Sequence, residues 1–283
     1  MNKWIVVRLL LSNWRRILGK PRFYIVFVAA LIYTWDLSKG IVEYAMIADY
    51  PTSLWVFPLY MSNSNAVLIF FLLVILLFCD APFLEQTESF VLIRSGRLRW
   101  LISQAIYVIS LSAAYVLWLV FCSIITVFPQ GALMNNWGSL LYSLANTNAP
   151  DLVELGFRIS PSMLTQFDPI SAMIYELLIC FLSTVFLGSL MFCVNLVSHR
   201  VVGVAFGSLI VLEQFLASNS SGYAFFYLSP ISWINLERIS FQAGGMTPSL
   251  AYVCCFLAGV SLIGWLVSYI VFRKRMIEVL ARL

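Results

Sequence analysis

The sequence predicts an all-α membrane protein, and three observations support that fold class. Hydrophobic residues make up 61% of the 283 residues and charged residues only 11%. The mean hydropathy is +0.92. A soluble domain carries roughly 25% charged residues, so this chain has too few to cover a water-soluble globule. The apolar residues are also gathered into stretches of about 20 residues, the length that crosses a bilayer as a helix. We therefore expect one transmembrane domain over residues 1–283.

Six stretches have the length and apolarity of a membrane-spanning helix. We place them at about 22–39, 58–79, 100–128, 170–198, 201–217 and 250–272. The first is the weakest, because its clean apolar run from Phe23 to Trp35 is short. Tyrosine and tryptophan flank several of the ends, as is common at membrane–water interfaces.

The first 21 residues predict an amphipathic helix that lies in the membrane interface. Apolar and basic residues fall on opposite faces at helical spacing. The apolar face contains Val7, Leu10, Leu11, Trp14, Ile17 and Leu18, and the polar face contains Arg8, Ser12, Arg15, Arg16 and Lys20. A calmodulin-type target helix has a similar pattern, but the direct junction with a spanning helix favours a membrane location.

The basic residues predict the orientation of the chain. Fourteen of the seventeen lie in the segment 1–22, the second–third connection, the fourth–fifth turn and the C-terminal tail. The other three are Lys39, Arg158 and Arg238. By the positive-inside rule, the side rich in basic residues, which includes both termini, faces the cytoplasm. The loops at 40–57, 129–169 and 218–249 then face out. Because this placement explains the net charge of +4, we do not predict nucleic-acid binding.

The connection between the second and third spans contains the strongest local motif, DAPFLEQTESFVLIRSGR at residues 80–97. Asp80 suits an N-cap, Pro82 suits a first helical turn and Gly96 suits a stop. A short helix over about 82–94 is predicted. Its mixed apolar and charged side chains are typical of contact with another protein, although a helix lying on lipid is the alternative. The expected contact residues are Phe83, Glu85, Glu88, Phe90, Val91 and Arg94.

The last outer loop contains an aromatic, apolar segment at 222–241 that Gly222 and Pro230 interrupt. We expect this segment to dip into the outer leaflet and return. A membrane tolerates such broken backbone only where other helices bury it. An interfacial loop anchored by tyrosine and tryptophan is the alternative.

Polar residues inside the spans are few. Glu176, Glu213 and Gln214 form the candidate intramembrane polar site, because an ionisable group in a membrane is a functional candidate. Pairing near the outer interface is the alternative for both carboxylates. In the fifth span, Gly203 and Gly207 lie on one helical face and allow another helix to approach closely. That helix belongs either to a second subunit or to the same chain.

Several chemical motifs are absent from the sequence. No GxxxxGK[ST] phosphate loop and no GxSxG turn occurs. His199 is the only histidine, which excludes an HExxH metal site. The six cysteines fall within apolar runs and form no CxxC pair, so we expect buried thiols. We therefore expect no enzyme, no metal and no cofactor in this chain.

Taken together, these features resemble the membrane subunits of ABC-2-type transporters. The resemblance is carried by the motif at 80–97 and by LSPISWI at 228–234 before the last span. It implies six spanning helices, a coupling helix over 82–94 docked on a separate cytoplasmic ATPase that binds ATP and Mg, and re-entrant half-helices at the outer face. It also implies a second membrane subunit, identical or homologous, that contacts the first and fifth spans and hence Gly203 and Gly207. The 129–169 loop departs from the family because it is longer than a tight hairpin.

On this resemblance, we expect the permease subunit of an ATP-driven exporter in a bacterial plasma membrane. The resemblance suggests that the substrate is a peptide or amphipathic antibiotic. The protein would either export this antibiotic or give immunity to it. One alternative is a membrane-anchored accessory or sensor subunit, which needs no ATPase-docking helix. Another is an ion-coupled secondary transporter, which should show inverted repeats and a charged site at mid-membrane.

Overall fold

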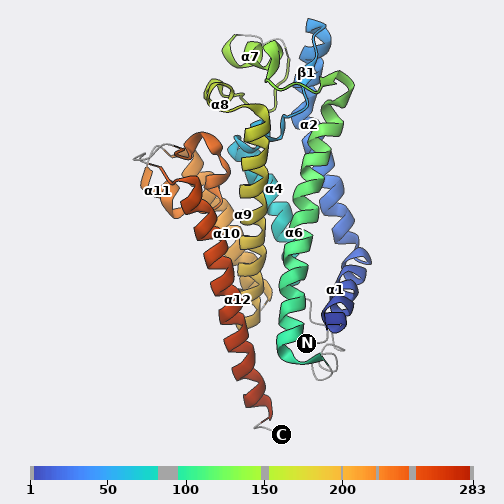
Figure 1. Cartoon of the computed structure of the whole chain (residues 1–283), viewed down its shortest axis with the longest axis vertical. Coiled ribbons are helices and arrows are strands. Elements are labelled where there is room, and N and C mark those ends of the chain that lie inside the picture. The colour runs from blue at the N-terminus through green and yellow to red at the C-terminus, as the bar shows by residue number, and fades with distance from the viewer. Residues whose placement is uncertain are drawn as a thin grey trace.

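The computed structural model describes residues 3–81, 95–147, 153–198, 200–220, 223–241 and 247–280. In these ranges the chain is a bundle of long helices, and its only strands are two of two residues each (Figure 1). Five helices are long and apolar enough to cross a membrane. They are α2 (Pro21–Ala48), α6 (Arg97–Val127), α9 (Pro169–Val197), α10 (Arg200–Asn219) and α12 (Leu250–Leu280). The prediction of an all-α membrane protein is confirmed.

The second expected span is divided into two helices, α3 (Phe57–Met61) and α4 (Ser64–Phe78). The break lies at Asn63, whose side chain accepts hydrogen bonds from the backbone N–H groups of Asn65, at 2.9 Å, and Ala66, at 3.2 Å. An asparagine in this position starts a new helix instead of continuing the old one. The apolar helix α4 therefore has 15 residues, and the count of six spans stays a prediction.

The first helix, α1 (Lys3–Leu18), packs against α6. The Trp14 indole N–H donates to the Ser110 hydroxyl at 3.1 Å, and its ring meets Tyr107 edge-on at 5.9 Å. Ile17 is buried, whereas Leu11 on the same predicted apolar face is exposed. The apolar stripe is thus divided between contact with α6 and a surface suited to lipid. In Figure 1, α1 and the last turns of α12 lie at the same end of the molecule, here called the termini end.

Residues 49–56, 128–147 and 153–168 fold together at the opposite end, and we call them the cap (Figure 1). Strand β1 (Thr52–Ser53) pairs in parallel with β2 (Gly131–Ala132). The Trp55 indole N–H donates to the Met134 carbonyl at 3.0 Å. The turn η1 (Phe128–Gln130) and two short helices, α7 (Gly138–Asn146) and α8 (Pro161–Gln166), complete the cap. The two loops that the sequence analysis treats separately are therefore one structural unit.

Helix α9 is the centre of the bundle, with α4, α6, α10 and α12 packed around it. Gly188 allows this packing, because a Cβ there would lie 3.0 Å from the Val108 side chain and 3.1 Å from the Phe78 ring. The core of the bundle is therefore built on a helix whose apolar residues point in every direction.

The segment before α12 is broken, as its sequence predicts. It forms α11 (Tyr223–Leu228) and the turns η3 (Ser232–Ile234) and η4 (Leu236–Arg238). Its central residues, including Trp233 and Ile234, are fully buried, and the Trp233 indole N–H donates to the Phe226 carbonyl at 2.8 Å. The segment thus packs into the bundle, and its depth in a membrane stays a prediction.

Candidate functional site

The predicted partner-contact residues Phe83, Glu85, Glu88, Phe90, Val91 and Arg94 lie outside the described residues. What the structure describes is how the chain leaves the bundle before this segment and returns after it. Ala81 ends the first part, and its N–H donates to the Phe78 carbonyl at 3.0 Å. Gly96 begins the second part with a φ of 82°, a conformation that favours glycine. Gly96 is the N-cap residue of α6, and the helix that was predicted to end there lies outside the described residues.

Asp80 forms an ion-pair cluster with the corner between α1 and α2. Its Oδ2 accepts from Lys20 Nζ at 3.0 Å and from Arg22 Nη2 at 2.7 Å. Arg22 also donates through Nη1 to the Cys79 Sγ at 2.7 Å. Hydrogen bonds from Arg22 and Lys20 hold the pKa of the Asp80 carboxyl well below its usual range, against the opposing effect of partial burial. Asp80 was expected to cap the helix over 82–94, and that helix lies outside the described residues. In the described part of the chain, the Asp80 carboxylate binds two cations.

Ala81 is held from the other side by α9. The Asn195 Nδ2 donates to the Ala81 carbonyl at 2.6 Å, and both residues are buried. Behind Asn195 lies Gly203 of α10, where a Cβ would overlap the Asn195 side chain. Two residues of the chain, Asp80 and Ala81, are therefore tied to α2 and to the α9–α10 hairpin. We call this group the joint, and its members are Lys20, Arg22, Asp80, Ala81, Asn195 and Gly203.

The two predicted interface glycines face helices of the same chain. Gly203 faces Asn195, and a Cβ on Gly207 would lie 3.2 Å from the Met191 Sδ and 3.6 Å from Ile75. The close approach that they permit is to α9 and α4, which was the alternative to a subunit contact. A second subunit against α10 stays a prediction, and it would have to use the exposed face of that helix.

The three candidate intramembrane polar residues are not brought together. Glu176 on α9 is 0% exposed, and neither carboxyl oxygen has a hydrogen-bond partner in the described part of the chain. Gln214 is buried on α10 and donates to the Ser218 hydroxyl at 3.2 Å. Glu213 is half-buried on the same helix. Glu176 is therefore an isolated buried carboxyl group, which is costly in an apolar interior.

Lys20, Arg22 and Asn195 were missed by the sequence analysis. A signal for the first two was present, because opposite charges lie at the predicted cytoplasmic ends of neighbouring spans, at residues 20–22 and at Asp80. Asn195 is the single amide in the apolar run MFCVNLV. A buried amide needs a partner, but the sequence does not reveal that the partner is a backbone carbonyl 114 residues away.

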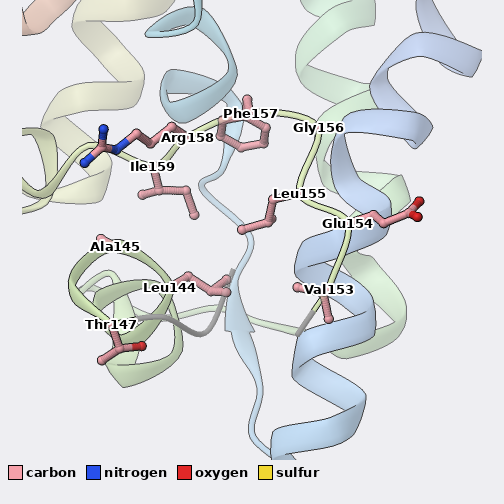
Figure 2. Close-up of a pocket in the computed structure, with 10 residues that line it drawn as sticks. All are labelled: Leu144, Ala145, Thr147, Val153, Glu154, Leu155, Gly156, Phe157, Arg158 and Ile159. Atoms are coloured by element: carbon pink, nitrogen blue, oxygen red, sulfur yellow. The ribbon is translucent and has the colours of Figure 1, made fainter. Parts of the chain in front are cut away.

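The cap contains a cavity of about 620 Å³ between α7 and residues 153–159. In Figure 2, Leu144, Leu155 and Ile159 point into this space, while Glu154 and Arg158 point away from it. Its interior is therefore mostly apolar, and none of the predicted site residues lines it. Over the described ranges, no cluster of three or more histidine, cysteine, aspartate or glutamate residues is arranged to bind a metal.

Comparison of the chain with family models, with curated proteins and with solved structures finds no match.

Proposed function

We propose that this chain is the membrane subunit of an ABC-2-type exporter that works with a separate ATPase chain. The observation that carries the proposal is the length of the connections at the termini end. Residues 19–20 join α1 to α2 and residues 198–199 join α9 to α10, whereas residues 79–96 join α4 to α6. Of these three connections, only the last is long enough to form a docking surface for a soluble partner.

The direction of energy flow supports the same assignment. The sequence has no phosphate loop, so ATP-driven work has to reach this chain through a protein contact. Under this proposal, ATP binding draws partner ATPase subunits together and moves the segment 82–94. Glu85, Glu88 and Arg94 supply its polar contacts, and Phe83, Phe90 and Val91 fill apolar grooves. This chain binds and moves and performs no covalent chemistry.

A second membrane subunit, identical or homologous, completes the proposed assembly. The outward face of α10 contains the exposed residues Phe206, Leu209 and Leu216. Half-buried Glu213 lies on the same face, about two helical turns after Phe206. A carboxyl group facing lipid is costly, so we expect a protein surface against this part of α10. The membrane is a bacterial plasma membrane in this proposal, with both termini in the cytoplasm.

The proposed substrate is a peptide or amphipathic antibiotic, moved out of the cell or away from its site of action. The resemblance to ABC-2 permeases is the main support for this class. The cavity of the cap adds weaker support, because its volume of about 620 Å³ is that of a small-molecule site.

The test is co-purification of an ATPase with the membrane-inserted chain, compared among four variants. Glu88→Lys and Phe90→Ala change the proposed docking segment. Glu154→Lys and Phe128→Ala make the same substitutions at exposed positions of the cap. Charge reversal at Glu88 should weaken binding by about 2–5 kcal/mol if Glu88 is buried against a partner cation. The proposal is supported if the ATPase is lost from Glu88→Lys and Phe90→Ala but is still recovered with the two cap variants. Equal recovery with all four variants contradicts it.

Ion-coupled secondary transport is a second candidate, and Glu176 is the observation in its favour. A buried carboxyl without a partner is the kind of group that binds a coupling proton or cation. Glu176→Gln keeps the shape of the side chain and removes its charge. It should abolish gradient-driven transport if this candidate is correct and leave ATP-driven export largely intact if it is not.

A further inference from the structure

We propose that the joint transmits movement of the segment 82–94 to α2 and to the α9–α10 hairpin, with Asn195 as the positioning residue. This inference rests on the proposed function, because it assumes that the segment is moved by an ATPase. It assigns a role to residues outside the docking segment itself.

The covalent chain connects the segment only to α4 and α6. Without further contacts, a force on residues 82–94 would act directly on those two helices alone. The ion pairs of Asp80 add a connection to the start of α2, at 3.0 Å from Lys20 and 2.7 Å from Arg22. The Asn195 bond to Ala81 adds a connection to α9 at 2.6 Å. Hydrogen bonds to an ionised group are about twice as strong as neutral ones, which applies to the two bonds of Asp80. The bond between Asn195 and Ala81 is neutral, but it is buried, where a hydrogen bond is stronger than in water.

The surroundings of Asn195 explain why an amide is present in an apolar helix. The Ala81 carbonyl lies just beyond the last turn of α4, where carbonyl groups lack partners within the helix. Asn195 is 6% exposed, and its Oδ1 has no hydrogen-bond partner in the described ranges. Within the described ranges, the one hydrogen bond of its side chain is therefore the bond to Ala81. Since Gly203 packs directly behind the amide, displacement of Ala81 pushes against α9 and α10 together.

Both ends of the segment adjoin buried residues, because Ala81 is 0% and Ser95 is 5% exposed. The joint has a particular role because its contacts reach Lys20, Arg22 and Asn195, which lie in elements that the segment's covalent connections to α4 and α6 do not reach.

The first test needs no partner protein. Cys79 adjoins the joint and is half-buried, so its alkylation rate reports whether the joint is closed. In a chain with Cys79 as the only cysteine, Asn195→Ala and Gly203→Ala should accelerate alkylation about fivefold, the factor that loss of one hydrogen bond predicts. Gly259→Ala is the matched control, because its Cβ would meet no atom within 4 Å. Unchanged Cys79 reactivity in both joint variants would overturn the inference.

The second test uses the complex with its ATPase. A single cysteine at Val202, exposed in the first turns of α10, should change its alkylation rate when Mg-ATP and vanadate are added. Asn195→Ala and Asn195→Asp should abolish this change while the ATPase still co-purifies. Asn195→Asp has almost the same size, and recovery of the ATPase with both variants guards against a variant that merely misfolds. A response that persists in both variants overturns the inference and leaves the proposed function standing. Failure of any ATPase to co-purify with the unmodified chain removes the proposed function and this inference with it.

Discussion

At the scale of single residues, Glu176 is an energetically costly feature of the bundle. Both of its oxygens are buried without a hydrogen-bond partner in the described part of the chain. Each unsatisfied buried polar group costs about 1–3 kcal/mol. Glu176→Met keeps a similar volume and removes the polar atoms, so we expect it to raise the free energy of unfolding by about 1–3 kcal/mol. The measurement is the melting temperature of the detergent-solubilised protein. A lower melting temperature would show that Glu176 has a partner, such as a bound ion.

Gly203 and Gly207 should differ in their sensitivity to substitution. A Cβ on Gly203 overlaps the Asn195 amide, which cannot move without breaking its bond to Ala81. A Cβ on Gly207 meets mainly the flexible Met191 side chain. We expect Gly203→Ala to cost about 1–3 kcal/mol of stability and Gly207→Ala clearly less. Equal losses of melting temperature in the two variants would contradict this account.

The glycine pair also shows what a residue pattern can and cannot predict. Two small residues four positions apart predict close approach of another helix, and the structure contains such an approach. The pattern does not say which helix approaches. The choice depends on Met191 and Asn195, which are close to the glycines only because α9 and α10 form a tight hairpin.

At the scale of elements, Arg238 fixes the broken segment to the end of α10. It donates to the Ala217 carbonyl at 3.3 Å and to the Ser218 carbonyl at 2.7 Å. These groups belong to the C-terminal turn of α10, where a cation is favourable. Arg238→Met keeps the apolar stem and loses both bonds, so we expect a loss of about 1–3 kcal/mol. The check is thermal unfolding, with Arg158→Met in the exposed cap loop as the control. Equal effects of the two substitutions would contradict the role assigned to Arg238 at the C-terminal end of α10.

The ion pairs of Asp80 give a prediction of pH dependence. The pKa of Asp80 is lowered in the folded protein. Its contribution to stability is therefore fully present above the unfolded value of about 3.9 and is lost only as the pH falls through the lower folded value. Asp80→Asn should cost about 1 kcal/mol, because the pairs are partly exposed. This difference should stay constant in melting experiments from pH 5 to pH 8. A difference that disappears by pH 5 would show that the two cations do not hold the carboxylate.

The element boundaries show where sequence reasoning stops. The starts of α6, α9, α10 and α12 fall within three residues of the expected spans, because uninterrupted apolar runs define them. Helix α2 continues to Ala48, well past the expected end at 39. Lys39 and Glu43 end the apolar run there, but the helix continues because the cap packs on it. Gly40 approaches the Glu154 backbone, where a Cβ would lie 2.7 Å from the carbonyl oxygen, and Tyr44 bonds Ser143 at 3.1 Å. These contacts join distant segments and leave no local signal.

At the scale of the whole molecule, charge and architecture divide the protein in the same way. The described basic residues of α1, the α1–α2 corner and the start of α6 lie at the termini end. Arg158 and Arg238 lie in segments at the opposite end, near the cap and α11 (Figure 1). Because loops rich in lysine and arginine stay in the cytoplasm, this division predicts the orientation of the entire bundle.

The orientation can be tested with two single cysteines in an otherwise cysteine-free chain. Leu98 in the first turn of α6 and Asn146 at the end of α7 are both exposed, so each reacts wherever the reagent can reach it. In intact cells, a membrane-impermeant maleimide should label Asn146→Cys immediately and Leu98→Cys only after the membrane is permeabilised. The two positions control for each other, because a leaky membrane would label both. The reverse pattern would place the cap in the cytoplasm, where it would face the ATPase. The joint and the segment 82–94 would then lie on the side that has no ATP, and the coupling route proposed here would be physically impossible.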